Sequence, residues 1–341
     1  MKKPLIVGLT YDLASDYHLE EGDPEDMYGE FDSEETLERL ETAISHLGHS
    51  VCRIGNIEKL VSFLFQRQTV DLVFNIAEGR HGRSRESQVP ALLDAYSIPY
   101  TFSDALTLGV SLDKALTKRL CQQAGLPTPP FCVLESSADY EVPFDLGLEF
   151  PLFVKPTQEG SSKGIRLESV AETVEQLKVQ VERVTRLYHQ SALVEEFLPG
   201  REFTAAILGT GKDANVLGVL EVTKVAVAKV NGFAQKTDWK TYGPIAFQPM
   251  GESPLQAQLT DISLRTYQLL GCRDAGRVDL RMDRNGCPQI MEINALSGLS
   301  SHSALPIIAA HAGLSFEMLV DRIICEAFAR SRSVLMDRAA C

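Results

Sequence analysis

Asp279, Glu292 and Asn294 are the residues whose types and spacing most clearly suggest chemistry. They lie on two short stretches, Arg277–Met282 and Gln289–Asn294, that flank an Asn-Gly turn, and this pattern predicts a β-hairpin. Side chains two residues apart on a strand share a face, so all three can point to one side of the hairpin. Two carboxylates and an amide oxygen suit Mg²⁺ that carries nucleotide phosphates. A polar hairpin on the surface is the alternative interpretation.

A lysine followed by a loop rich in glycine and serine is the second feature. Lys155 ends an apolar stretch, and the loop Gln158–Gly164 comes directly after it. One charge and several backbone N–H groups suit phosphate oxygens, although the lysine precedes the loop and the spacing is not that of a P-loop. Lys114 begins a predicted helix, where a lysine gains nothing from the helix dipole, so a phosphate contact is indicated there too. An ordinary turn and a surface lysine are the alternatives.

The acidic linker Val194–Glu202 joins two predicted strands. A linker of this kind can offer backbone groups and a carboxylate to the edge of an adenine. Glu202, at its end, is within reach of the hydroxyl pair of a ribose in such a geometry. Taken alone, the same residues are an ordinary acidic loop.

The first hundred residues alternate between strand and helix patterns, which predicts a parallel sheet with helices on its faces. The predicted strands are Leu5–Thr10, Val51–Ile54, Val70–Asn75 and Ile98–Tyr100, and the helices follow Ser33 as N-cap and cover Ile57–Arg67 and Gln88–Ala95. An unusually acidic loop, Asp12 to Asp32, follows the first strand. Loops in this position carry function in such sheets, and a solvated loop is the alternative.

The rest of the chain predicts two further α/β units. The predicted helices are Leu112–Ala124, Ser169–Val184, Ala304–Ala312 and Ser315–Ala329, and the strands before the hairpin are Phe131–Leu134, Phe150–Lys155, Ala192–Glu196 and Glu202–Leu208. We therefore expect three domains, at residues 1–105, 106–194 and 195–341. Thr223–Gly251 shows little periodicity and is long for a loop, so we predict a lid that keeps water from the site.

Composition excludes several classes of function. The chain of 341 residues is 44% apolar and 23% charged, and its net charge of −13 argues against nucleic acid as the main partner. Its seven scattered cysteines contain no C-x-x-C pair, which favours a reducing cytoplasm over a disulfide framework. No apolar stretch approaches the roughly 18–20 residues that a membrane span requires, so no membrane partner is expected.

The order of these features resembles an ATP-grasp enzyme and, more closely, the D-alanine–D-alanine ligase family. The resemblance covers most of the chain, from about Val70 to Ala329. Its most specific passage is Glu292–Pro306. The other matching motifs are Pro99-Tyr100-Thr101, Gly125-Leu126-Pro127-Thr128-Pro129, Glu159-Gly160-Ser161-Ser162 and Glu202-Phe203-Thr204. Coincidence across so many ordered motifs is implausible.

The resemblance implies an α/β ATP-grasp fold of three domains, with an N-terminal parallel sheet, that uses ATP and two Mg²⁺ ions, Mn²⁺ being an alternative. ATP would convert a carboxylate to an acyl phosphate, which an amine then attacks to form an amide. The implied cofactor-binding residues are Lys114, Lys155, Gly160, Ser161, Ser162, Glu195, Glu196, Leu198 and Glu202. The implied metal ligands are Asp279, Glu292 and Asn294. Arg277, Ser161 and Glu78 are the implied catalytic residues, and Arg277, Gly298, Ser303 and Ala304 the implied substrate contacts.

The N-terminal donor signature of the family is missing. A Gly-Gly-x-Ser-x-Glu turn, whose glutamate holds the donor ammonium, is replaced here by Gly8–Asp16, so Asp12 or Asp16 are candidate substitutes. Glu78 stands where the family usually has a histidine, and Arg83 and Arg85 follow it. Glu78 and the acidic loop favour a cationic donor, whereas the arginines favour an anionic one. The sequence leaves both open.

Three functions remain after these observations. The first is an ATP-dependent carboxylate–amine ligase that acts on D-alanine or on another small acid and amine, with a homodimer implied by the family. The second is an ATP-binding protein without turnover, against which the retained phosphate and metal residues argue. The third, an NAD-dependent Rossmann enzyme, is discounted because no G-x-G-x-x-G follows the first strand.

Overall fold

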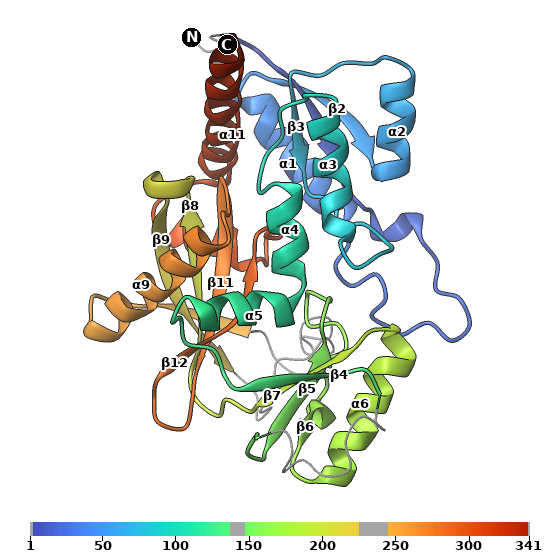
Figure 1. The fold of residues 1–341 in the computed structure, drawn as a ribbon. Helices are drawn as coiled ribbons and strands as arrows, with labels where there is room; N and C mark the ends of the chain where they lie inside the picture. The colour runs from blue at the N-terminus through green and yellow to red at the C-terminus, as the bar shows by residue number, and fades with distance from the viewer. Residues whose placement is uncertain (1–2, 137–146, 225–244, 340–341) are drawn as a thin grey trace.

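The computed structural model describes residues 3–136, 147–224 and 245–339 of the chain. Three sheets organise these residues, in the strand orders β2-β1-β3, β4-β7-β5-β6 and β10-β9-β8-β11-β12. Figure 1 shows them as an upper blue part, a lower green part and a central yellow-to-orange part. Short 3-10 turns occur at Ala14–Asp16, Arg85–Ser87, Leu167–Ser169 and Gly211–Asp213.

The N-terminal sheet is parallel, as predicted. It consists of β1 (Ile6–Thr10), β2 (Ser50–Gly55) and β3 (Leu72–Asn75), and its helices are α1 (Glu34–His46), α2 (Ile57–Phe65) and α3 (Gln88–Ala95). The Ser33 hydroxyl accepts a hydrogen bond from the Thr36 N–H, which confirms the predicted N-cap. The predicted strand Ile98–Tyr100 is wrong: only an isolated bridge forms, between Val73 and Tyr100. The stretch ends at the turn toward α4, so no further ladder bonds form.

The second sheet is antiparallel and holds β4 (Phe131–Leu134), β5 (Leu152–Pro156), β6 (Val170–Ala171) and β7 (Ala192–Glu196). Helix α6 (Val174–Tyr188) covers it with Leu177, Val181 and Val184. This helix begins five residues later than the predicted Ser169, because the Thr173 hydroxyl caps it after the edge strand β6. Before β4, α4 (Ala105–Leu112) and α5 (Lys114–Gln123) meet at Asp113, whose carboxylate caps α5 by accepting from the Leu116 N–H.

The third sheet is also antiparallel and carries the predicted hairpin. Its strands are β8 (Glu202–Leu208), β9 (Asn215–Lys224), β10 (Ile245–Pro249), β11 (Ala275–Met282) and β12 (Pro288–Asn294). Pairing of β9 with β10 shows that the predicted irregular segment Thr223–Gly251 is regular at both ends. Residues 225–244, on which the predicted lid falls, lie outside the described residues.

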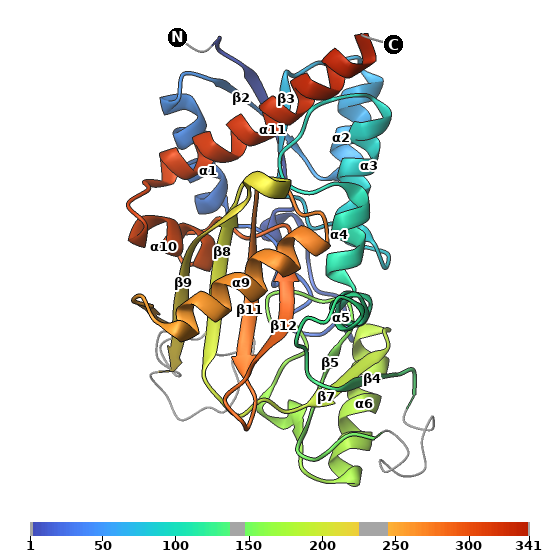
Figure 2. The ribbon, with the colours of Figure 1, turned by 60° about the vertical axis from the view of Figure 1, so that its left-hand side comes forward.

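The C-terminal helices complete the core. Helix α9 (Pro254–Leu269) packs across the third sheet, α10 (Ala304–His311) follows the β12 loop, and α11 (Phe316–Ala339) ends ten residues later than predicted. Figure 2 shows α11 running from the third sheet across the N-terminal part of the molecule. The Arg39 guanidinium of α1 stacks 3.6 Å from the centre of the Phe316 ring, which joins the two parts. The described helices include none that could cross a membrane.

Candidate active site

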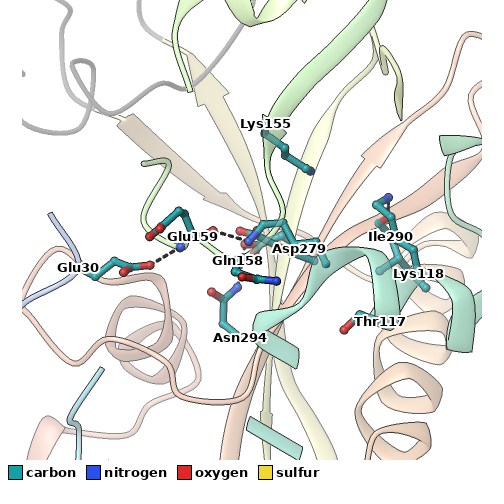
Figure 3. A network of polar contacts seen from close by, with 12 residues as sticks. Glu30, Thr117, Lys118, Lys155, Gln158, Glu159, Asp279, Ile290 and Asn294 are labelled. Carbon is teal, nitrogen blue, oxygen red and sulfur yellow. Dashed lines mark hydrogen bonds and ion pairs between the residues drawn. The ribbon is translucent and has the colours of Figure 1, made fainter. Parts of the chain in front are cut away.

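The hairpin places four polar side chains on one face of the third sheet. Asp279 pairs with Glu292 and Arg277 with Asn294 across β11 and β12, so all four point to the same side. One oxygen of Asp279 accepts hydrogen bonds from Arg277 Nη2 at 2.9 Å and from Asn294 Nδ2 at 3.2 Å. The predicted shared face is therefore present, and Figure 3 shows Asp279 and Asn294 at the centre of the polar network.

This donor set fits Mg²⁺ that is shared with a phosphate. Within the described ranges, no three His, Cys, Asp or Glu side chains gather closely enough to hold a metal alone. Asp279, Glu292 and the Asn294 amide oxygen thus leave several ligand positions to water and phosphate, as Mg²⁺ prefers. Arg277 Nε is buried and has no hydrogen-bond partner among the described residues, so one donor at the site is still available.

Lys114 links the hairpin to the Gly/Ser loop. Its ammonium lies 3.2 Å from Glu292 Oε2 and also contacts the Glu159 carbonyl oxygen. Its backbone N–H donates to the Thr157 carbonyl at 3.0 Å, which fixes the start of α5 against the loop that follows β5. Burial alone would lower the pKa of Lys114, but Glu292 raises it above the usual value, so the side chain is a cation.

Lys155 shares a buried carboxylate with a second lysine that sequence reasoning missed. Glu195 accepts from Lys155 at 2.7 Å through one oxygen and lies 2.8 Å from Lys118 through the other. Burial alone would raise the pKa of Glu195, but the two lysines hold it below its usual value. Burial lowers the pKa of Lys118 to about 8. Lys118 stands one helical turn after Lys114, and this i,i+4 spacing could have revealed it.

The acidic N-terminal loop packs onto the Gly/Ser loop. The Glu30 carboxylate accepts a hydrogen bond from the Gly160 N–H and pairs with Arg85 at 2.7 Å and Lys163 at 3.3 Å. A side chain at Gly160 would meet this carboxylate at 2.6 Å, so the close approach requires glycine. The Asp26 carboxylate accepts from the Gly164 N–H at 2.8 Å. The loop is therefore not simply solvated, and Figure 3 shows Glu30 beside Glu159.

The two serines of this loop expose its backbone. Ser161 and Ser162 have φ values of +47° and +63°, a left-handed conformation that non-glycine residues rarely adopt. Successive backbone N–H groups in a turn can form a concavity that binds an anion. Ser161 is exposed and Ser162 half-buried.

The predicted nucleotide contacts fall on two sides of β7. Glu195 faces the lysines, whereas its neighbour Glu196 faces away, since successive side chains of a strand alternate. Glu196 Oε1 accepts from the Glu149 N–H at 3.1 Å. A cavity of about 230 Å³ on that side is lined in part by Glu196, Phe197 and Leu198. Glu202 lies 3.7 Å from Arg281 on the paired strand β11.

The predicted acceptor residues surround the N-terminus of α10. Ser303 is the N-cap, Ala304 the first, buried helical residue, and the Ser303 and Ser300 hydroxyls lie 2.8 Å apart. A side chain at Gly298 would approach the Ser303 hydroxyl to 3.0 Å, so glycine leaves that hydroxyl accessible. The Ser297 hydroxyl donates to the Asn294 carbonyl at 3.0 Å. The helix N-terminus, suited to a carboxylate, is thereby fixed beside the hairpin.

The family described as D-ala D-ala ligase C-terminus matches residues 120–325 of this sequence. The chain belongs to the D-alanine–D-alanine ligase family. A D-alanine–D-alanine ligase of Bordetella petrii is 34% identical over 266 residues, 77% of this chain and 78% of that protein. An uncharacterised protein of Sinorhizobium fredii, y4sG, is 38% identical over 267 residues, 75% of this chain and 74% of that protein.

The fold agrees with that membership. The crystal structure of a Bacillus anthracis D-alanine–D-alanine ligase complexed with ATP superimposes with a TM-score of 0.73, covering 96% of this chain and 99% of that chain at 19% identity. The expected α/β ATP-grasp fold is thus confirmed. As a member of the D-alanine–D-alanine ligase family, the chain is an ATP-dependent ligase.

The donor end of the site, meaning the residues that stand where the family's N-terminal donor signature would be, departs from the ligase pattern. Asp16 pairs at 2.9 Å with Lys59 at the surface, so its carboxylate is already engaged there. Asp12 is buried, and its carboxylate accepts from the Gly79 N–H at 2.8 Å. Glu78 makes no hydrogen bond or ion pair with the described residues. Burial, together with the nearby Glu86 and Glu30 charges, raises the pKa of Glu78 well above its usual value.

Proposed function

We propose that this ligase uses Mg²⁺ and ATP to join the carboxylate of a small donor to the amine of an amino-acid acceptor. The supporting observation is the polar face of the hairpin, where Arg277, Asp279, Glu292 and Asn294 meet Lys114. Magnesium–ATP, when bound, supplies the phosphoryl group that activates the donor carboxylate. The products are an amide, ADP and phosphate.

The protein contributes positioning and charge rather than a nucleophile, as phosphoryl transfer requires. In this proposal Asp279, Glu292 and Asn294 hold the metal through oxygen. The Lys114 and Lys155 ammonium groups bind phosphate oxygens. Lys114 would exchange its contact with Glu292 for one with phosphate, which would free that carboxylate for the metal.

Two further groups act on charge that develops during transfer. The available Nε–H of Arg277 donates to an oxygen of the activated carboxylate, where a preorganised donor is most effective. The loop Gly160–Ser162 covers the phosphates with the backbone N–H groups of Ser161 and Ser162, since the Gly160 N–H donates to Glu30, and Ser161 is the exposed hydroxyl of that loop. In this proposal the nucleotide end, which binds the adenine and ribose of ATP, is formed by Glu195, Glu196, Leu198 and Glu202.

The acceptor binds at the N-terminus of α10. Gly298, the Ser303 hydroxyl and the Ala304 N–H hold its carboxylate, so its amine is directed toward the hairpin face. A homodimer, a cytoplasmic location and the division into domains at residues 105 and 194 remain predictions.

Replacing Glu292 with Gln tests the proposal. The substitution keeps the shape but removes one of the two carboxylates from the metal site. We expect ADP formation, with D-alanine and other amino-acid pairs as substrates, to fall by about a hundredfold or more. Glu58→Gln, on the exposed face of α2, is the matched control and should leave the rate unchanged. An unaltered rate in Glu292→Gln would contradict the assigned metal site, and ATP binding without ADP formation would favour the non-catalytic alternative.

A further inference from the structure

Three carboxylates converge at the donor end without a partner. Glu78 follows β3, Asp32 precedes α1, and Glu86 lies in the short turn before α3. The side-chain carboxylates of the three make no hydrogen bond or ion pair with the part of the chain that the structure describes. Glu86 is only 9% exposed, so water does little to solvate its charge.

One backbone network brings these residues together. The Gly79 N–H donates to the Asp12 carboxylate at 2.8 Å, and the Asp32 N–H donates to the Asp12 carbonyl at 3.0 Å. Gly79 has a φ of +74°, and a side chain there would meet the Arg85 carbonyl at 2.7 Å. This close contact holds the segment of Glu78 against the segment of Glu86. The three carboxylates are thus positioned by the fold at the carboxyl ends of the parallel strands, where ligands bind in such sheets.

The neighbouring cations are already balanced by other anions. Arg85 pairs with Glu30 at 2.7 Å and with Glu159 at 3.3 Å, and Lys163 pairs with Glu159 at 2.6 Å. Arg83 pairs with Asp113 at 2.8 Å. The arginines that would favour an anionic donor are therefore committed elsewhere.

Arg80 and Lys114 make other contacts. The exposed Arg80 guanidinium stacks on the Tyr17 ring at 4.6 Å, and Lys114 contacts Glu292. Among the described residues, no cation forms an ion pair with Asp32, Glu78 or Glu86.

Buried carboxylates without a cation are costly and shift toward their neutral forms. Burial and the Asp12 charge raise the pKa of Asp32 to about 7, and burial raises that of Glu86 to about 7 despite the opposing Arg85 charge. One carboxylate is enough for the α-ammonium of an ordinary amino acid. The site offers more negative charge than that, and no three His, Cys, Asp or Glu side chains of the described residues form a group that could hold a metal ion.

We propose that Glu78, Glu86 and Asp32 form a subsite for a second ammonium group, so that the preferred donor is a small diamino acid. This inference rests on the proposed ligase function and adds the class of donor. The side-chain ammonium replaces the missing cation and hydrogen-bonds the carboxylates. The donor carboxylate loses one oxygen to phosphate, and the acceptor amine loses a proton as the amide forms.

Donor competition with the purified full-length protein tests the subsite. Ornithine, norvaline and glutamate, each in D and L form, are supplied with D-alanine, Mg²⁺ and ATP, and ADP formation is followed. Ornithine and norvaline share the length of the chain but differ in the terminal ammonium. Tandem mass spectrometry of the product reads the N-terminal residue, which is the donor. We expect kcat/KM for ornithine to exceed that for norvaline by at least about tenfold, as a charge-assisted contact implies.

Glu86→Gln separates the subsite from the ligase chemistry. We expect the variant to lose about tenfold or more in kcat/KM for ornithine while its kcat/KM for norvaline stays the same or rises. Glu58→Gln should change neither value. A thermal melt of each variant confirms that it is folded, and ornithine with Mg²⁺–ADP should raise the melting temperature of the native protein more than that of Glu86→Gln.

The outcomes separate the two proposals. Equal or better turnover of norvaline or glutamate by the native protein would overturn the diamino-acid donor and leave the ligase function intact. An unchanged ornithine-to-norvaline ratio in Glu86→Gln would overturn the assigned subsite. Absence of ADP formation with every pair, with no ornithine effect on melting, would overturn both.

Discussion

At the scale of single residues, the charge of the site depends on which ionised side chains form ion pairs within the protein. Lys118 and Lys155 share Glu195, and Arg85 and Lys163 share Glu30 and Glu159, so these groups are neutralised within the protein. Asp32, Glu78 and Glu86 are not. Asp32, Glu78 and Glu86 are therefore the carboxylates of the site whose charge a bound cationic ligand would balance.

Asp32 makes the unfolding free energy of the ligand-free protein depend on pH. Its folded pKa of about 7 lies above the usual value, so the folded state binds a proton that the unfolded state has lost. This contribution is present in acid and is lost as the pH rises through about 7. We expect Asp32→Asn to stabilise the protein by about 1 kcal/mol at pH 8 and by little at pH 4. Urea unfolding at both pH values measures this, and an equal effect at both would contradict it.

Lys118 is expected to stabilise the nucleotide end through Glu195. Lys118→Met removes one of the two cations that hold this buried carboxylate in its charged form. We expect the unfolding free energy to fall by about 2–3 kcal/mol and KM for ATP to rise, because Lys155 alone then balances the charge of Glu195. Lys178→Met, elsewhere on a helix surface, serves as the control. A variant with native stability and native KM would show that the pair is dispensable.

At the scale of elements, the sequence predicted what short-range patterns determine. The hairpin of β11 and β12 follows from an Asn-Gly turn between alternating residues, and the pairing of Asp279 with Glu292 follows from its register. Helix caps formed by single polar residues were harder to predict from the sequence. The predicted helix Leu112–Ala124 corresponds to α5, which begins only at Lys114 because the Asp113 carboxylate caps it, and α4 before it was not predicted.

Contacts between distant elements could not be predicted. Glu30 reaches Gly160 across 130 positions of sequence, and no local pattern encodes that distance. The acidity of the loop was evident, but which of its carboxylates would be buried depended on how it packs against the Gly/Ser loop. The same holds for Arg83 and Arg85, whose charges favoured an anionic donor until their partners were known.

The contact between the acidic N-terminal loop and the Gly/Ser loop is expected to stabilise the protein near neutral pH. Glu30→Gln keeps the side-chain shape but leaves Arg85 and Lys163 with less negative charge. We expect a loss of about 2 kcal/mol in the unfolding free energy at pH 7 and faster cleavage of the acidic loop by protease. Burial alone would raise the pKa of Glu30, but Arg85 and Lys163 hold it below its usual value, so the loss should shrink as the pH falls below about 4.

Glu25→Gln provides the comparison for that measurement. Glu25 lies in the same loop, is exposed, and undergoes the same change of charge. Equal stability of the two variants would show that the buried contact of Glu30 contributes nothing beyond net charge.

At the scale of the whole molecule, α11 joins the N-terminal part to the third sheet. Arg330 donates to the buried Asp274 at 2.9 Å, just before β11, and to the Tyr100 carbonyl at 2.9 Å. Asp274 in turn accepts from the Phe102 N–H at 2.8 Å. One arginine thus connects a C-terminal helix, the hairpin sheet and the segment that leads into α4.

Removing Arg330 should weaken the coupling between these parts. Arg330→Met leaves Asp274, which is 0% exposed, without its cation, so we expect a loss of about 3 kcal/mol in the unfolding free energy at pH 8. Burial already raises the pKa of Asp274 to about 7, and without Arg330 it should rise further, so the loss should be smaller at pH 5, where the carboxyl is protonated. Asp274→Asn in the same background should restore part of the stability, since a neutral amide needs no cation. Calorimetry should then show Arg330→Met unfolding over a broader range than the native protein, and a single sharp transition at the native temperature would mean that the parts are held together without this arginine.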